Sequence, residues 1–113
     1  MKIHTSTIRY AGQDRLDITV KSGDRAFAPT WEMVMGYKNG SISATEYRKL
    51  YIALMRVSYV EHKQRWLEVL GMDNVTFCCY CRAGDFCHRA ILAELFAAVG
   101  KANNVPVEVC GER

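Results

Sequence analysis

The residues best suited to chemistry lie together in segment 81–89, which reads CRAGDFCHR. The segment offers thiols at Cys81 and Cys87, the imidazole of His88 and the guanidinium of Arg89. A thiolate is a nucleophile, and an imidazole beside it can act as its base. Consecutive helical residues point about 100° apart, so Cys81 makes a better partner for His88 than Cys87 does. The catalytic candidates are therefore Cys81, Cys87 and His88.

The same segment also fits anion binding. A β-branched and aromatic run, 75–80, precedes it, and apolar residues at helical spacing follow it from Ile91 to Val99. A strand that feeds a helix through a loop presents free N–H groups and the positive end of a helix dipole at one point. This reasoning adds four ligand-binding candidates from the segment: Arg89, Arg82, Gly84 and Asp85.

Arg89 needs a negative partner, because an arginine in the first turn of a helix opposes the helix dipole. Asp85 or Asp17 can supply that charge from within the chain, and a bound phosphate can supply it from outside. A planar guanidinium pairs equally well with a carboxylate or a phosphate. The sequence leaves both arrangements open.

A zinc site is an alternative use of the cysteines, four of which fall between positions 78 and 87. Cys78 and Cys81 have knuckle-like spacing. In a regular strand, however, Cys78 and Cys81 point to opposite faces, whereas Cys79 and Cys81 share one. The chain also has no second Cys-x-x-Cys pair. We therefore expect Cys78 and Cys79 to pack as small buried residues, with no metal or other cofactor, and keep zinc as the alternative.

A second loop, 20–29, follows another predicted strand. Ligands in open α/β sheets bind outside the carboxyl ends of the strands, so this loop and segment 81–89 are expected to line one pocket. Trp31 and Tyr80 are candidates for stacking on a base. The polar and cationic candidates near this second strand end are Thr19, Lys21, Ser22 and Arg25.

Hydrophobic periodicity predicts the elements that position these residues. Ser43 and Glu46 form a capping box, and a bend is expected near Ser58 in the long helix that follows. The expected strands are 2–9, 15–20, 75–80 and 105–110. The expected helices run from Trp31 to Gly36 or Gly40, from the capping box to Leu70, and along Ile91–Val99, the last stopped by Gly100. This order predicts a small three-layer α/β domain with a mostly parallel four-stranded sheet flanked by helices, spanning residues 1–113 as a single domain.

The composition narrows the possible classes of protein and of binding partner further. Half of the residues are hydrophobic and the formal net charge is +3, with the charges scattered, so the chain is an ordinary globular one and charge alone does not indicate nucleic acid. Nucleic acid stays open as a partner, as does a homodimer through the long helix. We expect no signal peptide and no membrane partner, and a cytoplasmic location in which the cysteines stay reduced.

The segment Phe77–Leu95, FCCYCRAGDFCHRAILAEL, resembles the signature of the domain of unknown function 488 family, small bacterial and phage proteins. Cys81, Cys87, His88 and Arg89 fall on the motif of that family. Leu16–Val34, LDITVKSGDRAFAPTWEMV, is similar to members of the family as well. The resemblance implies an α/β fold and a Cys-His-Arg site, and it supplies no reaction.

These observations favour a binding module that captures a phosphate-bearing, nucleotide-like small molecule at the strand–loop–helix segment. One alternative is a cysteine-dependent hydrolase or transferase that acts on a nucleotide or nucleic acid. Another is a zinc-stabilised interaction domain associated with DNA. The sequence does not decide whether the protein is an enzyme.

Overall fold

The computed structural model describes residues 1–82 and 85–113. The strands within this part of the chain are β1 (Lys2–Thr7), β2 (Arg15–Asp17), β3 (Asn74–Cys79) and β4 (Glu108–Glu112). The helices are α1 (Trp31–Lys38), α2 (Ala44–Glu61), α3 (Lys63–Leu70) and α4 (His88–Ala102). The order of elements is the one that the periodicity predicts.

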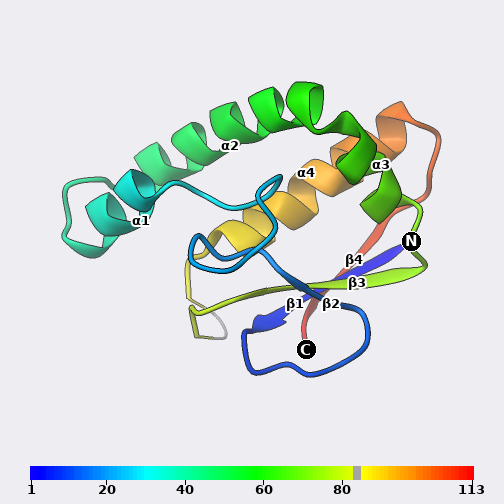
Figure 1. The fold of residues 1–113 in the computed structure, drawn as a ribbon, viewed down its shortest axis with the longest axis horizontal. Helices are drawn as coiled ribbons and strands as arrows, with labels where there is room; N and C mark the ends of the chain where they lie inside the picture. Colours follow the sequence, from blue (N-terminus) through cyan, green and yellow to red (C-terminus); the bar gives the residue numbers. More distant parts are fainter. Residues whose placement is uncertain (83–84) are drawn as a thin grey trace.

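The four strands form one sheet in the order β2-β3-β1-β4, and every neighbouring pair is parallel. This confirms the α/β class and the predicted parallel sheet. The layers can be followed in Figure 1, where α4 lies along the sheet and α2 lies beyond α4. Sheet, α4 and α2 are the three layers of the domain.

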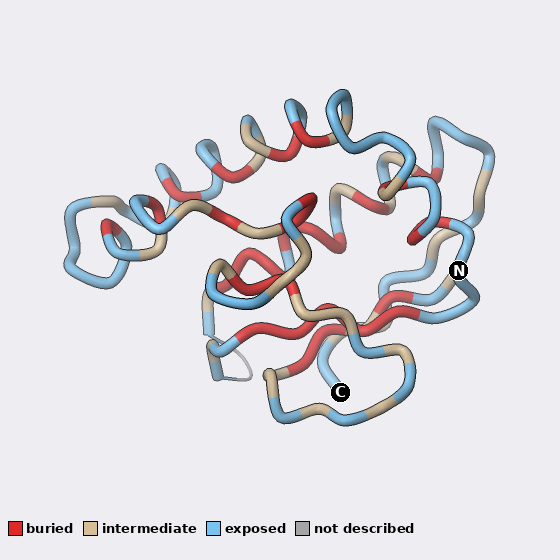
Figure 2. Tube along the Cα trace, viewed as in Figure 1, coloured by how far each residue is buried: buried red, intermediate tan, exposed pale blue. Residues whose placement is uncertain are grey.

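Aromatic side chains fill the space between the sheet and the helices. The ring of Phe77 on β3 lies 5.4 Å from that of Phe96 on α4. Trp66 on α3 stacks on Phe96 at 4.7 Å, and Phe27 meets Trp66 edge-on at 5.1 Å. Figure 2 shows buried residues along the strands and on the inward sides of the helices. Burial of these rings is the main stabilisation of the fold.

The starts of α1 and α2 follow the capping rules. The Ser43 hydroxyl accepts a hydrogen bond from the Glu46 N–H at 3.1 Å, which confirms the capping box. The predicted bend is a break at His62, whose φ of −118° and ψ of 33° separate α2 from α3. Ser58, one turn earlier, is buried, donates to the Ala26 carbonyl and accepts from the Trp66 indole at 3.0 Å. These contacts hold the two helices against the core.

The second strand is shorter than the predicted 15–20. It ends at Asp17 because the Asp17 carboxylate accepts hydrogen bonds from the Thr19 N–H at 2.9 Å and from the Ser22 hydroxyl at 2.6 Å. A side chain that bonds to the backbone two residues on starts a turn and competes with the strand ladder.

The prediction that Gly100 stops the last helix is wrong, because α4 continues to Ala102. A Cβ at Gly100 would lie 2.4 Å from a methyl carbon of Val107. Glycine is required here because the chain that leaves α4 packs back across it. This return also delays the last strand, which begins at Glu108 instead of the predicted 105.

None of the helices in the described part of the chain has both the length and the apolar character needed to cross a lipid bilayer.

Candidate functional site

The candidate site lies at the carboxyl end of β3, where the chain passes into α4. Cys79 is the last residue of β3, and Cys87 is the N-cap of α4 with an extended backbone, φ −156° and ψ 152°. The sulfur atoms of Cys79, Cys81 and Cys87 all lie within 4.8 Å of one another. Cys79 and Cys87 are buried, and Cys81 is partly exposed. The segment thus gathers three thiols at one point.

Strand alternation explains which cysteines meet. Cys79 and Cys81 point to the same side, as predicted, whereas Cys78 turns to the opposite face and places its sulfur 3.5 Å from the Thr76 carbonyl oxygen. Cys78 is a buried strand residue, as expected. Cys79 is buried too, but it belongs to the cluster, and the sequence analysis had treated it as packing alone.

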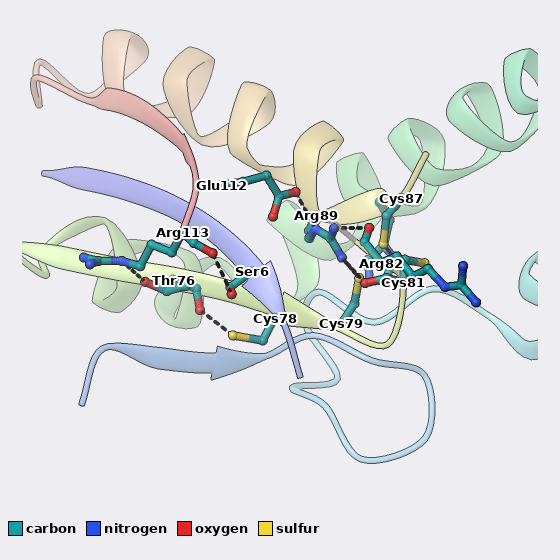
Figure 3. A network of polar contacts seen from close by, with 11 residues as sticks. Ser6, Thr76, Cys78, Cys79, Cys81, Arg82, Cys87, Arg89, Glu112 and Arg113 are labelled. Atoms are coloured by element: carbon teal, nitrogen blue, oxygen red, sulfur yellow. Dashed lines mark hydrogen bonds and ion pairs between the residues drawn. The ribbon is translucent and has the colours of Figure 1, made fainter. Parts of the chain in front are cut away.

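Arg89 lies behind the sulfur cluster and is 1% exposed. Its Nη1 donates to the Cys79 sulfur at 2.8 Å and to the Cys81 carbonyl at 2.9 Å, and its Nη2 donates to the Arg82 carbonyl at 2.7 Å. Figure 3 shows the guanidinium between the loop and β4. Arg89 therefore fixes the loop from within the protein.

The carboxylate that pairs with Arg89 is Glu112 on β4, whose Oε1 accepts from Nε at 3.0 Å. The structure brings neither of the predicted internal partners, Asp85 and Asp17, into an ion pair with Arg89 within the described ranges 1–82 and 85–113. Those two assignments are wrong because Asp17 is bound in its own turn and Asp85 is exposed. A carboxylate of the chain does pair with Arg89, but it belongs to Glu112 on β4, which is far away in sequence.

His88 is buried at the first position of α4. Its Nε2 lies 2.7 Å from the Ile18 carbonyl oxygen, which can only accept, so Nε2 carries the proton. Its Nδ1 is then the acceptor, and it lies 3.5 Å from the Cys87 sulfur. Burial lowers the pKa of His88, so the imidazole is neutral near pH 7.

The observed partner of His88 corrects the predicted one. Cys81 was preferred over Cys87 because consecutive helical residues diverge. Cys87, however, is the N-cap residue and has an extended backbone, so helical geometry does not apply to it. Its sulfur can therefore contact the ring of the next residue.

The three thiols share protons and charge. Hydrogen bonds from the thiols of Cys79 and Cys87, aided by the charge of Arg89, lower the pKa of Cys81 to about 3. Hydrogen bonds with Cys79 and Cys81, together with burial, raise the pKa of Cys87, and the bond to Cys81 raises the pKa of Cys79. Arg89 contacts the sulfur of Cys79 rather than that of Cys81. Among the three thiols, Cys81 is therefore the one that ionises first.

A cavity of about 300 Å³ opens in front of these residues. Its buried end is formed by Cys79, Cys87 and His88, with the partly exposed Cys81 beside them. Aromatic side chains from three parts of the chain line it as well, namely Trp31, Tyr37, Tyr47, Tyr80 and Phe86. Two lysines, Lys21 and Lys38, stand at its exposed side.

The ligand candidates of the second loop are divided by the structure. Thr19 and Lys21 line the cavity, as do the predicted stacking residues Trp31 and Tyr80. Ser22 is bonded to the Asp17 carboxylate and helps shape the turn. Arg25 lines a separate small cavity against α2. The two predicted loops therefore do line one pocket, but only through part of their residues.

The ligand candidates of segment 81–89 are also divided. The Arg82 side chain is exposed and extends away from the cluster in Figure 3, while its carbonyl holds Arg89. Asp85 is exposed, and its N–H donates to the Arg82 carbonyl at 3.1 Å. Gly84 lies outside the described residues.

Sequence reasoning missed Tyr37, Lys38 and Tyr47, which α1 and α2 bring to the cavity, and Glu112 behind it. No local pattern marks these residues, because their position depends on how distant helices pack. The Cys79 cluster had a usable signal in the strand alternation that places Cys79 and Cys81 on one face.

The chain matches a family model described as the active DUF488-N3 subclade over residues 1–100. It belongs to the domain of unknown function 488 family, as the resemblance of segment 77–95 predicted. No curated protein and no solved structure matches the chain.

Proposed function

We propose that this member of the domain of unknown function 488 family binds a nucleotide-like small molecule, a planar ring that carries a phosphate, in the cavity in front of the sulfur cluster. The observation that carries the proposal is the lining of this cavity of about 300 Å³, which combines aromatic walls with cationic groups at its exposed side. Small-molecule sites have this composition of apolar walls and a few polar groups.

The aromatic walls suit a flat ring. Trp31 and Tyr80 keep more than half of their surface exposed, 53% and 58%, although they line the cavity. Exposed aromatic faces are platforms on which bases stack, each contributing about 1–3 kcal/mol. Tyr37, Tyr47 and Phe86 form a cluster beside them, with ring centroids 5.1–5.7 Å apart. A planar ring is therefore the ligand part that these walls favour.

The charges suit an anion. Lys21 and Lys38 both line the cavity, and within the described part of the chain neither forms an ion pair with a carboxylate. Both lysines stand at the exposed side of the cavity, so this side is where the proposed ligand would hold its phosphate.

The test is thermal unfolding with three probes: a nucleoside, its monophosphate and inorganic phosphate. A ligand that binds only the folded protein raises Tm. The monophosphate should give the largest shift, because it alone uses both the aromatic walls and the lysines. Titration calorimetry then gives its Kd.

Two variants locate the site. Lys21→Ala removes one charge-assisted contact and should weaken monophosphate binding by about ten- to a hundredfold. Trp31→Ala removes one stacking face and should weaken it by about five- to a hundredfold. Lys49→Ala and Leu50→Ala on the exposed side of α2 are matched controls that should bind like the wild type. Equal binding by all four variants, or no Tm shift with any probe, would contradict the proposal.

We propose that the protein, whether encoded by a bacterium or by a phage, is located in the bacterial cytoplasm. All five cysteines are free, and thiols persist in that reducing compartment.

A further inference from the structure

An imidazole nitrogen, which is a metal ligand like the thiol sulfur, lies beside the sulfur cluster. The three sulfurs of Cys79, Cys81 and Cys87 lie within 4.8 Å of one another, and Nδ1 of His88 lies 3.5 Å from the Cys87 sulfur. Zinc binds thiolate sulfur at about 2.3 Å and imidazole nitrogen at about 2.0–2.1 Å, so tetrahedral geometry places two sulfurs about 3.8 Å apart and a sulfur and a nitrogen about 3.6 Å apart. The Cys87–His88 edge already has this length. The sulfurs need to draw together by about 1 Å at most, and Nδ1 of His88, which is outside the group of atoms within 4.8 Å of one another, needs to move toward Cys79 and Cys81.

The His88 ring is oriented as a metal ligand. A ligating histidine nearly always donates its other ring N–H to a carboxylate, a carbonyl or water, which fixes the ring and leaves the metal-facing nitrogen unprotonated. Here Nε2 donates to the Ile18 carbonyl at 2.7 Å, and the lone pair of Nδ1 faces the Cys87 sulfur. The required tautomer is thus set by the backbone of the residue that follows β2.

The charge around the cluster also fits. Three thiolates and one Zn²⁺ ion carry a net charge of −1, which is costly to bury unless a cation compensates it. Arg89 is such a cation, fully buried, with its Nη1 2.8 Å from the Cys79 sulfur. Glu112 also pairs with Arg89, through Nε, but its side chain is 36% exposed and partly solvated, whereas the Nη1 side of the guanidinium faces the buried sulfur. Hydrogen bonds of this kind to ligating atoms are typical of metal sites.

We propose that Cys79, Cys81, Cys87 and His88 form a zinc site of the Cys3His type at the buried end of the cavity. All four ligands come from residues 79–88, which is feasible because the strand ends at Cys79 and Cys87 is an extended N-cap. Zinc would hold both ends of the loop between β3 and α4. It would also hold these three thiols as zinc-bound thiolates instead of free thiols. This inference stands whether or not the cavity binds a nucleotide.

The test is elemental analysis of the intact protein, purified without chelator and desalted. The wild type should contain about one zinc per chain, and a chelator that removes the zinc should lower Tm, since metal bound only by the folded state stabilises it. Cobalt(II) in place of zinc should give intense thiolate-to-metal charge-transfer absorption.

Neighbouring cysteines give a matched pair of variants. Cys79→Ala should lose the zinc, while Cys78→Ala, which changes a buried cysteine on the opposite face of the same strand, should retain it. Cys81 is partly exposed, so Cys81→Ser is the variant to use if Cys79→Ala does not fold, and it should lower zinc content as well. His88→Ala should keep the three sulfurs and weaken zinc binding by at least about tenfold in competition with a chelator.

The proposal is overturned if reduced wild-type protein contains no zinc and does not take up added zinc. It is equally overturned if Cys81→Ser retains the wild-type zinc content, or if Cys78→Ala loses the metal. Rapid alkylation of Cys81 in the protein as purified, without release of zinc, would show a free nucleophile instead.

Discussion

The two faces of the sheet are built from alternate residues of the same strands and have become different environments. The helix face carries Val75, Phe77 and Cys79 of β3 toward α4, and the loop face carries Thr76 and Cys78 toward the opposite side. The C-terminal end of the chain divides in the same way. Glu112 pairs with Arg89 on the helix face, and Arg113 reaches Thr76 on the loop face (Figure 3). Arg113 also pairs with Asp14 there.

Both faces therefore hold an arginine paired with a carboxylate, but the surroundings differ. The side chain of Arg89 is 1% exposed, and it also binds a sulfur and two carbonyls. The side chain of Arg113 is 35% exposed and pairs with Asp14 at 3.3 Å. Among the residues described, only the first of these two arginines contacts the sulfur cluster, and the cavity lies in front of that cluster. Two similar ion pairs therefore contribute differently to stability because one of them is buried. They differ in their possible function because only the buried pair lies beside the sulfur cluster.

The largest expected effect comes from Arg89. Arg89→Ala should lower the free energy of unfolding by about 3–5 kcal/mol, because it leaves two carbonyls, a sulfur and Glu112 without their buried partner. Arg113→Ala should cost about 0–1 kcal/mol, as expected for a solvated pair. Urea unfolding of both variants measures the difference. Equal losses would mean that burial does not separate the two faces.

Arg89→Lys sharpens this result. Lysine keeps the charge but lacks the planar fork of donors that reaches several acceptors at once. It should recover only part of the stability lost in Arg89→Ala. Full recovery would show that charge alone, and not the geometry of the guanidinium, stabilises the helix face.

A smaller effect is expected from Thr76 on the loop face. Its hydroxyl donates to the Asp14 carboxylate at 2.7 Å and accepts from Arg113 Nε at 3.1 Å. Thr76→Val keeps the shape and removes both bonds, so the free energy of unfolding should fall by about 1–3 kcal/mol. Thr45→Val, at an exposed position of α2, is the control and should stay within about 0.5 kcal/mol of the wild type. A Thr76→Val variant as stable as the control would show that the hydrogen bonds of the loop face do not stabilise the protein.

The smallest effect concerns pH. Burial opposes ionisation of Asp14, but hydrogen bonds from Tyr10 and Thr76 and the charge of Arg113 outweigh it, so its pKa lies below the usual value of 3.8. The stability that it contributes is present above that usual value and is lost as pH falls through the lower pKa of the folded state. Asp14→Asn should therefore be less stable than the wild type near neutral pH, by at most about 1 kcal/mol, and should approach it in strong acid. A difference that grows in acid would reverse the assigned sign.

The fold could be read from the sequence where signals are local. Ser43 with Glu46 identified the start of α2, and the run 75–80 identified a buried strand. Gly100 misled because its role is nonlocal: it admits Val107 against the helix and does not end it. The end of β2 was missed because the Asp17 side chain competes with the strand ladder, which hydrophobic spacing does not reveal.

The candidate site could be read only in part. Segment 81–89 concentrates the reactive groups, and strand alternation brings Cys79 to Cys81. Glu112 could not be found this way, because it is 23 residues from Arg89 and meets it only through the placement of β4. The same holds for Tyr47, which reaches the cavity because α2 packs on α4. Local chemistry was visible in the sequence, and the partners supplied by tertiary packing were not.

The central claim is that ligand binding belongs to the helix face, and NMR mapping tests it most directly. Amide chemical shifts of the ¹⁵N-labelled protein are followed while a nucleoside monophosphate is added. The account predicts changes at cavity residues such as Lys21, Tyr37 and Tyr80, and none at loop-face residues such as Tyr10, Asp14 and Arg113. Changes centred on the loop face, or no changes at saturating ligand, would contradict it.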